Sequence, residues 1–309
     1  MKSRIMTHRV FLLNPKRLLI VLLVFSLAFF FVQQNAIKET RAAGNLLFVG
    51  DFETGDFSGW HCKNGSWGNC PTVVSAQGSV QPRAGSFMMK SFLNPRTSSV
   101  AYRTETVLLG ENDILHEFNI GSEYWFGLSI YLPGGQPLEM GVLGQFHGRA
   151  DTHLGERSRN PHLALRLYDG SWRVTMNWDS KPNTYESGER VYDGSKDWVL
   201  GAAEADKWTD WVIHVKLSYE SDGLLEVYQD GQKVISHNGG NCYNDERGPY
   251  WKMGIYNASW KDRPGIGARV AYHDELRVGG ADASYKDVAS RGSTPPQIFL
   301  PFVSKSSLP

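Results

Sequence analysis

The chain has 309 residues, and its 32 lysines and arginines balance its 32 aspartates and glutamates. A net charge of zero argues against a general binder of nucleic acid or membrane surfaces, so any preference for anions must be local. The 32 glycines, 10 tryptophans, 13 tyrosines and 15 phenylalanines indicate a turn-rich β protein with aromatic surfaces, a composition typical of sugar-handling proteins. The length suffices for one large β domain or two small ones.

Residues 1–43 have the pattern of an export signal. An unbroken apolar run over 18–32 is followed by the small residues Ala42 and Ala43. The run is shorter than the ~20 residues that a membrane-spanning helix needs. We therefore expect a cleaved signal peptide, with an uncleaved anchor as the alternative, and a chain that is secreted or faces the outside. The basic residues before the run are Lys2, Arg4, Arg9, Lys16 and Arg17.

We divide the rest into one domain over residues 44–285 and a tail over residues 286–309, which combines a proline-rich spacer with a short apolar end. Cys62 and Cys70 flank a short polar loop, and we expect them to form a disulfide in an oxidising compartment. Cys242 is then left over as a buried or unpaired thiol. The cysteine and histidine spacing does not suggest zinc.

Acidic residues stand near both ends of the predicted domain. Asp51 and Glu53 lie in an acidic turn, and Asp274 lies in the last alternating run. Carboxylates spaced in this way could hold a calcium ion, which prefers oxygen ligands, or they could simply form turns. The first and last strands of a β-sandwich often pair, which would bring the two segments together.

From Asn45 onward, short alternating runs are separated by turn residues, including the hairpin signals Asp169-Gly170 and Asp230-Gly231. About a dozen short strands, without a convincing amphipathic helix, predict an all-β antiparallel sandwich of two sheets. The main predicted strands cover residues 86–93, 99–108, 123–132, 140–149, 162–168, 172–178, 208–218, 224–228, 233–235, 250–256 and 268–278.

The run over 140–149 places Val142 and Phe146 on a core face and Leu143, Gln145 and His147 on the other face. An amide and an imidazole two residues apart on the non-core face could act on one ligand. Polar alternation on a solvated surface is the simpler interpretation of the same pattern.

The segment from Arg149 to Arg166 is the most cationic part of the mature chain. Its histidines, His153 and His162, lack helical i,i+4 spacing, so we do not expect them to bind a metal together with His147. The charged residues of the cationic segment are Arg149, Arg157, Arg159 and Arg166, against Asp151 and Glu156.

In the predicted strand over 99–108, Arg103 and Glu105 share a face. They could form an ion pair, or Arg103 could be free to contact a substrate carboxylate.

The run over 250–256 is the most informative stretch. As a strand it directs Lys252 and Tyr256 to one face, with only Gly254 between them. A lysine and a phenol in one groove suit an anionic substrate that must lose and regain a proton. The alternative is an edge strand with a solvated lysine. The opposite, apolar face consists of Trp251, Met253 and Ile255.

In order and spacing, these blocks resemble the heparin lyase I/glucuronan lyase group of polysaccharide lyases, a family 20-like group. The resemblance extends from Phe52 to Gly279. It implies a jelly-roll, concanavalin A-like sandwich with a concave substrate cleft. The matching blocks are 123–133, Gln145-Phe146-His147, 211–216, Asp230-Gly231 and 252–256.

The resemblance implies β-elimination on a uronic-acid polysaccharide. A donor must neutralise the carboxylate as the C5 proton leaves, a base must take that proton, and an acid must protonate the leaving oxygen. By resemblance, Gln145 is the neutraliser, Tyr256 is the acid and a candidate base, and His147 is the alternative base. Lys252 would favour the phenolate form of Tyr256 or bind the substrate carboxylate.

The resemblance also implies that Arg83 and Arg103 bind the sugar acid, and we add Arg149 and Arg166 from the cationic segment. Family members bind calcium, which favours a structural ion at Asp51, Glu53 and Asp274. No organic cofactor is expected.

The sequence has no large basic cluster suited to a heavily sulfated chain, so we favour an unsulfated polyuronide, glucuronan first and alginate second. A non-catalytic carbohydrate-binding sandwich is the main alternative. A glycoside hydrolase would need two carboxyl groups about 5–10 Å apart, and no strand offers such a pair on one face. We expect a monomer that binds an anionic polysaccharide, binds no nucleic acid and contacts a membrane only through an uncleaved N-terminal segment.

Overall fold

The computed structural model describes residues 45–62, 69–94, 102–109, 116–263 and 265–291. The expected signal over residues 1–43 and most of the expected tail lie outside these residues. The folded unit begins at Leu46. Within the described part of the chain, no helix is both long enough and apolar enough to cross a membrane.

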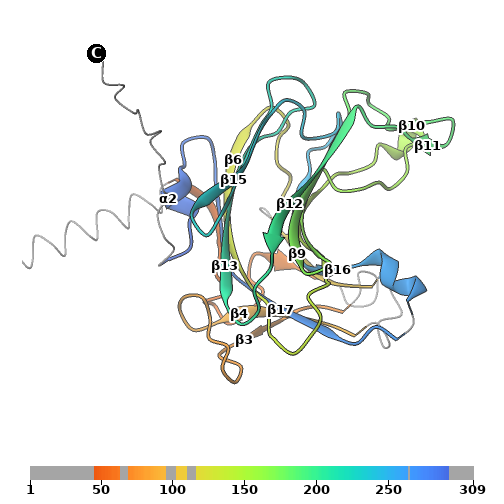
Figure 1. Ribbon diagram of the computed structural model, residues 1–309. Coiled ribbons are helices and arrows are strands. Elements are labelled where there is room, and N and C mark those ends of the chain that lie inside the picture. The colour runs from red at the N-terminus through yellow and green to blue at the C-terminus, as the bar shows by residue number, and fades with distance from the viewer. Residues whose placement is uncertain (1–44, 63–68, 95–101, 110–115, 264, 292–309) are drawn as a thin grey trace, which may run out of the picture. The chain divides into compact units, whose positions relative to one another are not determined.

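An eight-stranded antiparallel sheet forms one layer of the folded unit (Figure 1). The first strand pairs with the last long strand, as expected for a sandwich. The strands of the eight-stranded sheet, in spatial order, are β15 (Gln232–Asn238), β14 (Leu224–Gln229), β13 (Trp208–Lys216), β6 (Glu123–Tyr131), β17 (Arg269–Gly279), β4 (Met88–Leu93) and β3 (Thr72–Val74), with β1 (Leu46–Gly50) paired to β17.

A seven-stranded antiparallel sheet forms the second layer. The short hairpin of β10 (Tyr185–Glu186) and β11 (Glu189–Arg190) and the 3-10 helix η3 (Ala258–Asp262) both project on the side of this sheet that faces away from the eight-stranded one (Figure 1). The strands of the seven-stranded sheet, in spatial order, are β12 (Gly194–Ala202), β9 (Ser171–Trp178), β8 (Leu163–Tyr168), β7 (Gly141–His147), β16 (Tyr250–Tyr256), β5 (Arg103–Leu108) and β2 (Trp60–His61).

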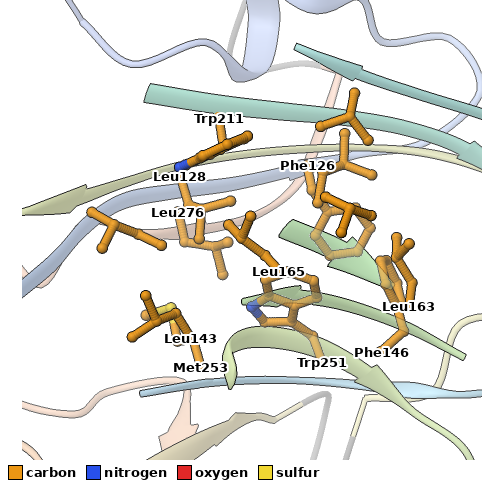
Figure 2. Packing of buried hydrophobic residues seen from close by; sticks show 14 of the residues in the cluster. Phe126, Leu128, Leu143, Phe146, Leu163, Leu165, Trp211, Trp251, Met253 and Leu276 are labelled. Atoms are coloured by element: carbon orange, nitrogen blue, oxygen red, sulfur yellow. The ribbon is translucent and has the colours of Figure 1, made fainter. Parts of the chain in front are cut away.

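The core lies between the two sheets (Figure 2). Alternate side chains of each strand point inward, so Trp251, Met253 and Ile255 are buried as predicted. Trp172 of one sheet meets Trp211 of the other, with ring centroids 5.1 Å apart. The all-β jelly-roll sandwich predicted from the sequence is confirmed.

The predicted alternation of inward and outward side chains fails within β7 of the seven-stranded sheet. Val142 was expected on the core face, but Leu143 belongs to the core cluster instead. A Cβ on Gly144 would also meet core atoms of Trp251. The register of β7 against β8 shifts by one residue between Val142 and Gly144. This bulge reverses the alternation on one side of it and leaves Phe146 inward and Gln145 outward, as predicted.

Covalent and terminal features complete the unit. Cys62 and Cys70 form a disulfide, and Cys242 is a buried free thiol. The packed chain continues beyond the predicted domain end at residue 285, because the short helix α2 (Tyr285–Val288) buries Val288 completely against the eight-stranded sheet. The 3-10 helix η2 (Thr152–Leu154) lies in the segment that follows β7.

Candidate active site

The outer face of the seven-stranded sheet brings the predicted catalytic residues together. Lys252 on β16 lies opposite Gln145 on β7, and Tyr256 on β16 lies opposite Arg103 on β5. His147 ends β7 on the same face as Gln145. Three adjacent strands therefore join residues from three distant parts of the sequence.

Glu105 of β5 connects this group. Its Oε2 forms an ion pair with Lys252 Nζ at 2.8 Å, and its Oε1 accepts a hydrogen bond from Gln145 Nε2 at 2.5 Å. Arg103 Nη1 lies 3.6 Å from Oε2. The structure therefore contains the Arg103–Glu105 pair that the sequence offered as one interpretation, and it adds two partners that the sequence did not reveal.

Burial separates the site into two layers. Glu105, Gln145 and Lys252 are only 2%, 1% and 2% exposed, so they form a floor beneath the accessible residues. Burial opposes ionisation of Glu105 most strongly, but Lys252 and Arg103 together hold its pKa below the ordinary value. Burial lowers the pKa of Lys252, and Glu105 partly opposes that shift. The one carboxylate of the floor thus faces two cations, Lys252 within the floor and the more exposed Arg103.

His147 lies above this floor as a neutral base. Burial and, to a smaller extent, Lys252 lower its pKa to about 4. Its Nδ1 lies 2.7 Å from the carbonyl oxygen of Gly148. A carbonyl can only accept, so this contact assigns the ring proton to Nδ1 and leaves a lone pair on Nε2. The side chain can therefore accept a proton at neutral pH.

Two tyrosines flank the floor at the ends of β16. The Arg103 guanidinium lies 4.3 Å from the centroid of the Tyr256 ring. The ring of Tyr250 lies 5.3 Å from that of His147, and the Arg149 guanidinium lies 5.1 Å from the Tyr250 centroid. Arg149 is thus at the His147 end of the site, where it also forms an ion pair with Glu117.

Arg166 lies on the same face, two strands from β16. It is opposite Val142 of β7, and Val142 is opposite Tyr256. Its Nε donates a hydrogen bond to Thr175 Oγ1 at 2.9 Å. All four residues predicted to act on the substrate therefore share one face with three of the four predicted to bind it. The first set is Gln145, His147, Lys252 and Tyr256, and the second is Arg103, Arg149 and Arg166.

Arg83 does not belong to this group, which corrects the prediction. Its Nε and Nη2 donate hydrogen bonds to the Asp210 carboxylate at 2.9 and 2.8 Å. Asp210 lies on β13 of the eight-stranded sheet, and Asp230 and Ser129 also contact Asp210 there. The guanidinium is therefore fixed on the other sheet of the sandwich.

The predicted calcium ligands contact the loop before β4. Glu53 accepts hydrogen bonds from the N–H groups of Ser86 and Phe87. Asp274 Oδ2 accepts from the N–H groups of Arg83 and Ala84. Because the Asp274 carboxylate is buried, its pKa is raised to about 8, and a cation would offset this cost. Two acids from opposite ends of the domain thus flank one loop, but among the described residues Asp51, Glu53 and Asp274 do not form a group of three whose ligand atoms lie within 4.8 Å of one another. Asp51 contacts the N–H of Glu53.

Two other sets of carboxylates lie close together in the described part of the chain. In one of them Arg159 forms ion pairs with both Glu156 and Asp245, so a guanidinium already supplies the positive charge. His162 is completely buried beside Asp245. This cluster fixes the segment after β7. The sets are Asp151 with His153 and Glu246, and Asp151 with Glu156 and Asp245.

Glu105 and Tyr250 lie among the site residues but were not predicted to be part of the site. Both positions carried a usable signal, because Tyr250 shares the parity of Lys252 in β16 and Glu105 shares that of Arg103 in β5. What the sequence could not supply was the register, which sets Glu105 beside Lys252 and Gln145.

Comparison with known proteins agrees with this architecture. A family model described as polysaccharide lyase matches residues 52–277. The solved structure of an endo-β-1,4-glucuronan lyase from the fungus Trichoderma reesei is similar at 19% identity, with a TM-score of 0.62 and coverage of 79% of this chain and 98% of that one. An alginate lyase from a Chlorella virus gives 13% identity and a TM-score of 0.47, with 76% and 100% covered.

At 19% identity the likeness to the glucuronan lyase structure shows the fold alone, and no curated protein matches the sequence. The family model, in contrast, spans most of the chain. The chain therefore belongs to the polysaccharide lyase family.

Proposed function

We propose that this lyase cleaves a uronic-acid polysaccharide by β-elimination on the outer face of the seven-stranded sheet. The observation that carries the proposal is that a neutral imidazole, a phenol and an accessible guanidinium lie on one face of three adjacent strands, around a buried ion pair. His147, Tyr256 and Arg103 supply these groups. Elimination next to a carboxylate needs a base, an acid and a cation near the developing negative charge.

Each residue has a chemical task in this scheme. The lone pair on His147 Nε2 takes the C5 proton of the uronate. The electrons of that bond form the C4–C5 double bond as the C4–O bond breaks, and the Tyr256 hydroxyl protonates the departing oxygen. Arg103 neutralises the carboxylate while charge develops on it. Tyr256 could also take the proton itself, as the sequence left open.

Gln145 and Lys252 act from the floor. Gln145 is held by Glu105 through one N–H, so its second N–H is the group that could reach a substrate carboxylate. Lys252 is held by the same Glu105 and adds positive potential beneath the substrate. Both contributions depend on Glu105, which keeps the two side chains in place.

We propose glucuronan as the substrate, with alginate second. The similar fungal structure is a glucuronan lyase by its description, and the cations of this face are few and spread over four strands, which suits one carboxylate per sugar better than a heavily sulfated chain. We also propose that the chain is exported, and that Glu53 and Asp274 hold a structural calcium ion that acts on stability and not on the reaction.

The test is an ultraviolet absorbance assay of residues 44–309 against glucuronan, alginate, heparin and hyaluronan. Elimination leaves a conjugated double bond that absorbs, whereas hydrolysis and binding leave none. We expect absorbance to rise fastest with glucuronan. Faster cleavage of heparin would overturn the substrate proposal. A flat trace with every polymer, while one polymer still binds, would identify a binding module instead.

A further inference from the structure

A second group of cations lies on the same face, across the sheet from the catalytic residues. The strand registers define one row of side chains that runs from Arg103 and Tyr256 through Val142 to Arg166 and Arg173. Neighbouring strands are about 4.8 Å apart, so Arg166 and Arg173 lie roughly 10 and 14 Å from the Tyr256 backbone. Backbone to backbone, the second group therefore begins two strands away from Tyr256, on the part of the face where a neighbouring sugar of the same polymer would lie.

The charges in this second group are not balanced. Arg166 and Arg173 are directly opposite each other on β8 and β9, an arrangement in which like charges repel. Asp197 of β12 forms an ion pair with Arg173, from Oδ2 to Nη1 at 3.0 Å. Two guanidinium groups thus share one carboxylate, which leaves an excess positive charge on this part of the face.

Arg166 carries most of this excess. Within the described residues it forms no ion pair, and its hydrogen bond goes to the neutral hydroxyl of Thr175. The side chain is partly buried. Burial lowers its pKa, and the nearby Asp197 offsets that shift only in part, so its charge lacks full hydration and a counter-ion of its own. A bound carboxylate would supply that counter-ion, and a guanidinium suits a carboxylate through paired N–H donors.

An exposed aromatic ring stands beside the two arginines. Tyr168 follows Arg166 by two residues on β8, so it points to the same face. Its side chain is 50% exposed, and the Arg173 guanidinium lies 5.9 Å from its ring centroid. An exposed ring of this kind offers an apolar surface on which a sugar ring can lie.

We propose that Arg166, Arg173 and Tyr168 form a second uronate subsite. Arg166 and Arg173 bind the carboxylate of a sugar that neighbours the reacting one, and Tyr168 supports its ring. The polysaccharide then crosses the strands from β5 toward β9. This inference rests on the proposed function, because it assumes a polymer with a carboxylate on successive sugars.

The decisive experiment compares two variants that break the same ion pair with opposite effects on charge. Arg173→Gln removes a cation, whereas Asp197→Asn removes the competing carboxylate. In a Tyr256→Phe background, which blocks turnover, glucuronan binding is measured by isothermal titration calorimetry. We expect Arg173→Gln and Arg166→Gln each to weaken binding about tenfold, as loss of a charged hydrogen bond predicts, and Asp197→Asn to tighten it about threefold.

Lys233→Gln is the matched control, since it breaks an exposed ion pair with Glu226 on the eight-stranded sheet, and it should leave binding unchanged. If the Arg173–Asp197 pair has only a structural role, both Arg173→Gln and Asp197→Asn should weaken binding and lower the melting temperature. That result, or unchanged binding in all variants, overturns the subsite.

The same experiment separates this inference from the proposed function. If wild-type protein eliminates glucuronan but the opposite shifts do not occur, the subsite alone is wrong. If the shifts occur without any elimination, the subsite stands and the lyase reaction on glucuronan is wrong. If neither glucuronan nor alginate binds, both are wrong.

Discussion

The outer faces of the two sheets handle charge in opposite ways. On the eight-stranded sheet, carboxylates are at least as numerous as the cations that they contact. Arg83 pairs with Asp210, Arg277 with Glu275 and Lys233 with Glu226, and a further carboxylate, Glu123, contacts His214. On the seven-stranded sheet, cations share carboxylates. Lys252 and Arg103 share Glu105, and Arg166 and Arg173 depend on Asp197.

The comparison shows that polar residues alone do not identify a functional face. Both faces bury charged groups, but a balanced set is complete without a ligand, because each charge already has its counter-ion. An unbalanced set gains stability when an anion binds. The excess of cations on the seven-stranded sheet is therefore the feature that an anionic polysaccharide can use.

The largest effect should come from the phenol on the unbalanced face. Tyr256→Phe removes the proposed acid and should lower kcat by about 10²–10⁴-fold, the usual contribution of general acid–base catalysis. Tyr228→Phe on the balanced face should change kcat less than about twofold. Steady-state absorbance assays measure both variants. A Tyr256→Phe enzyme with full activity would exclude this phenol from the reaction.

A large effect on stability should come from Glu105, the carboxylate that Lys252 and Arg103 share. Glu105→Gln removes the carboxylate that pairs with buried Lys252, and breaking a buried ion pair should cost about 3–5 kcal/mol in the free energy of unfolding. Glu226→Gln on the balanced face breaks a partly exposed ion pair with Lys233 and should cost about 1 kcal/mol or less. Chemical denaturation compares the two. Equal losses would remove the distinction between the faces.

Low pH should reduce kcat/KM by protonating His147 on the seven-stranded sheet. Its pKa of about 4 keeps the imidazole neutral at all higher pH values, so the acid limb of kcat/KM should fall near pH 4 and not near the ordinary pKa of about 6.5. A pH–rate profile of the wild-type enzyme measures this limb. An acid limb near pH 6.5 would contradict His147 as a buried neutral base.

The same pH range should affect stability. His273 is completely buried, and burial lowers its pKa to about 4. Because the unfolded chain binds the proton more tightly, this contribution is fully present above about pH 6.5 and is lost as pH falls toward 4. The loss from His273 should be on the order of 3 kcal/mol. Unfolding measured across this range should show the decline, and His273→Asn should reduce it.

The smallest effect should come from metal removal, far from the reacting groups. If Glu53 and Asp274 hold calcium, a chelator should lower the melting temperature by a few degrees, corresponding to about 1–3 kcal/mol, and Glu53→Gln should abolish the difference. Differential scanning calorimetry with and without calcium gives this result independently of activity. Identical melting curves would remove the calcium proposal.

The sequence predicted the residues of the site better than it predicted their connections. Period-two alternation was enough to bring Lys252 and Tyr256 onto one face and to direct Gln145 and His147 outward. It failed at Val142 and Leu143, because a bulge depends on the register with the neighbouring strand and leaves no unique mark in one sequence.

The remaining error concerns which sheet a residue joins. Arg83 and Arg103 looked equivalent as isolated arginines, but Arg83 contacts Asp210 on the eight-stranded sheet. That contact depends on how strands distant in sequence are ordered in each sheet, which alternation cannot reveal. The role of Glu105 was missed for the same reason, since its partners come from β7 and β16.

The most direct test of the account is the chemistry of the products. Wild-type protein is incubated with glucuronan, and the oligosaccharides are analysed by mass spectrometry together with ultraviolet absorbance. We expect chains whose new non-reducing ends absorb and whose masses are lower by one water than those of hydrolysis products. Products that have gained a water and do not absorb would contradict elimination on this face.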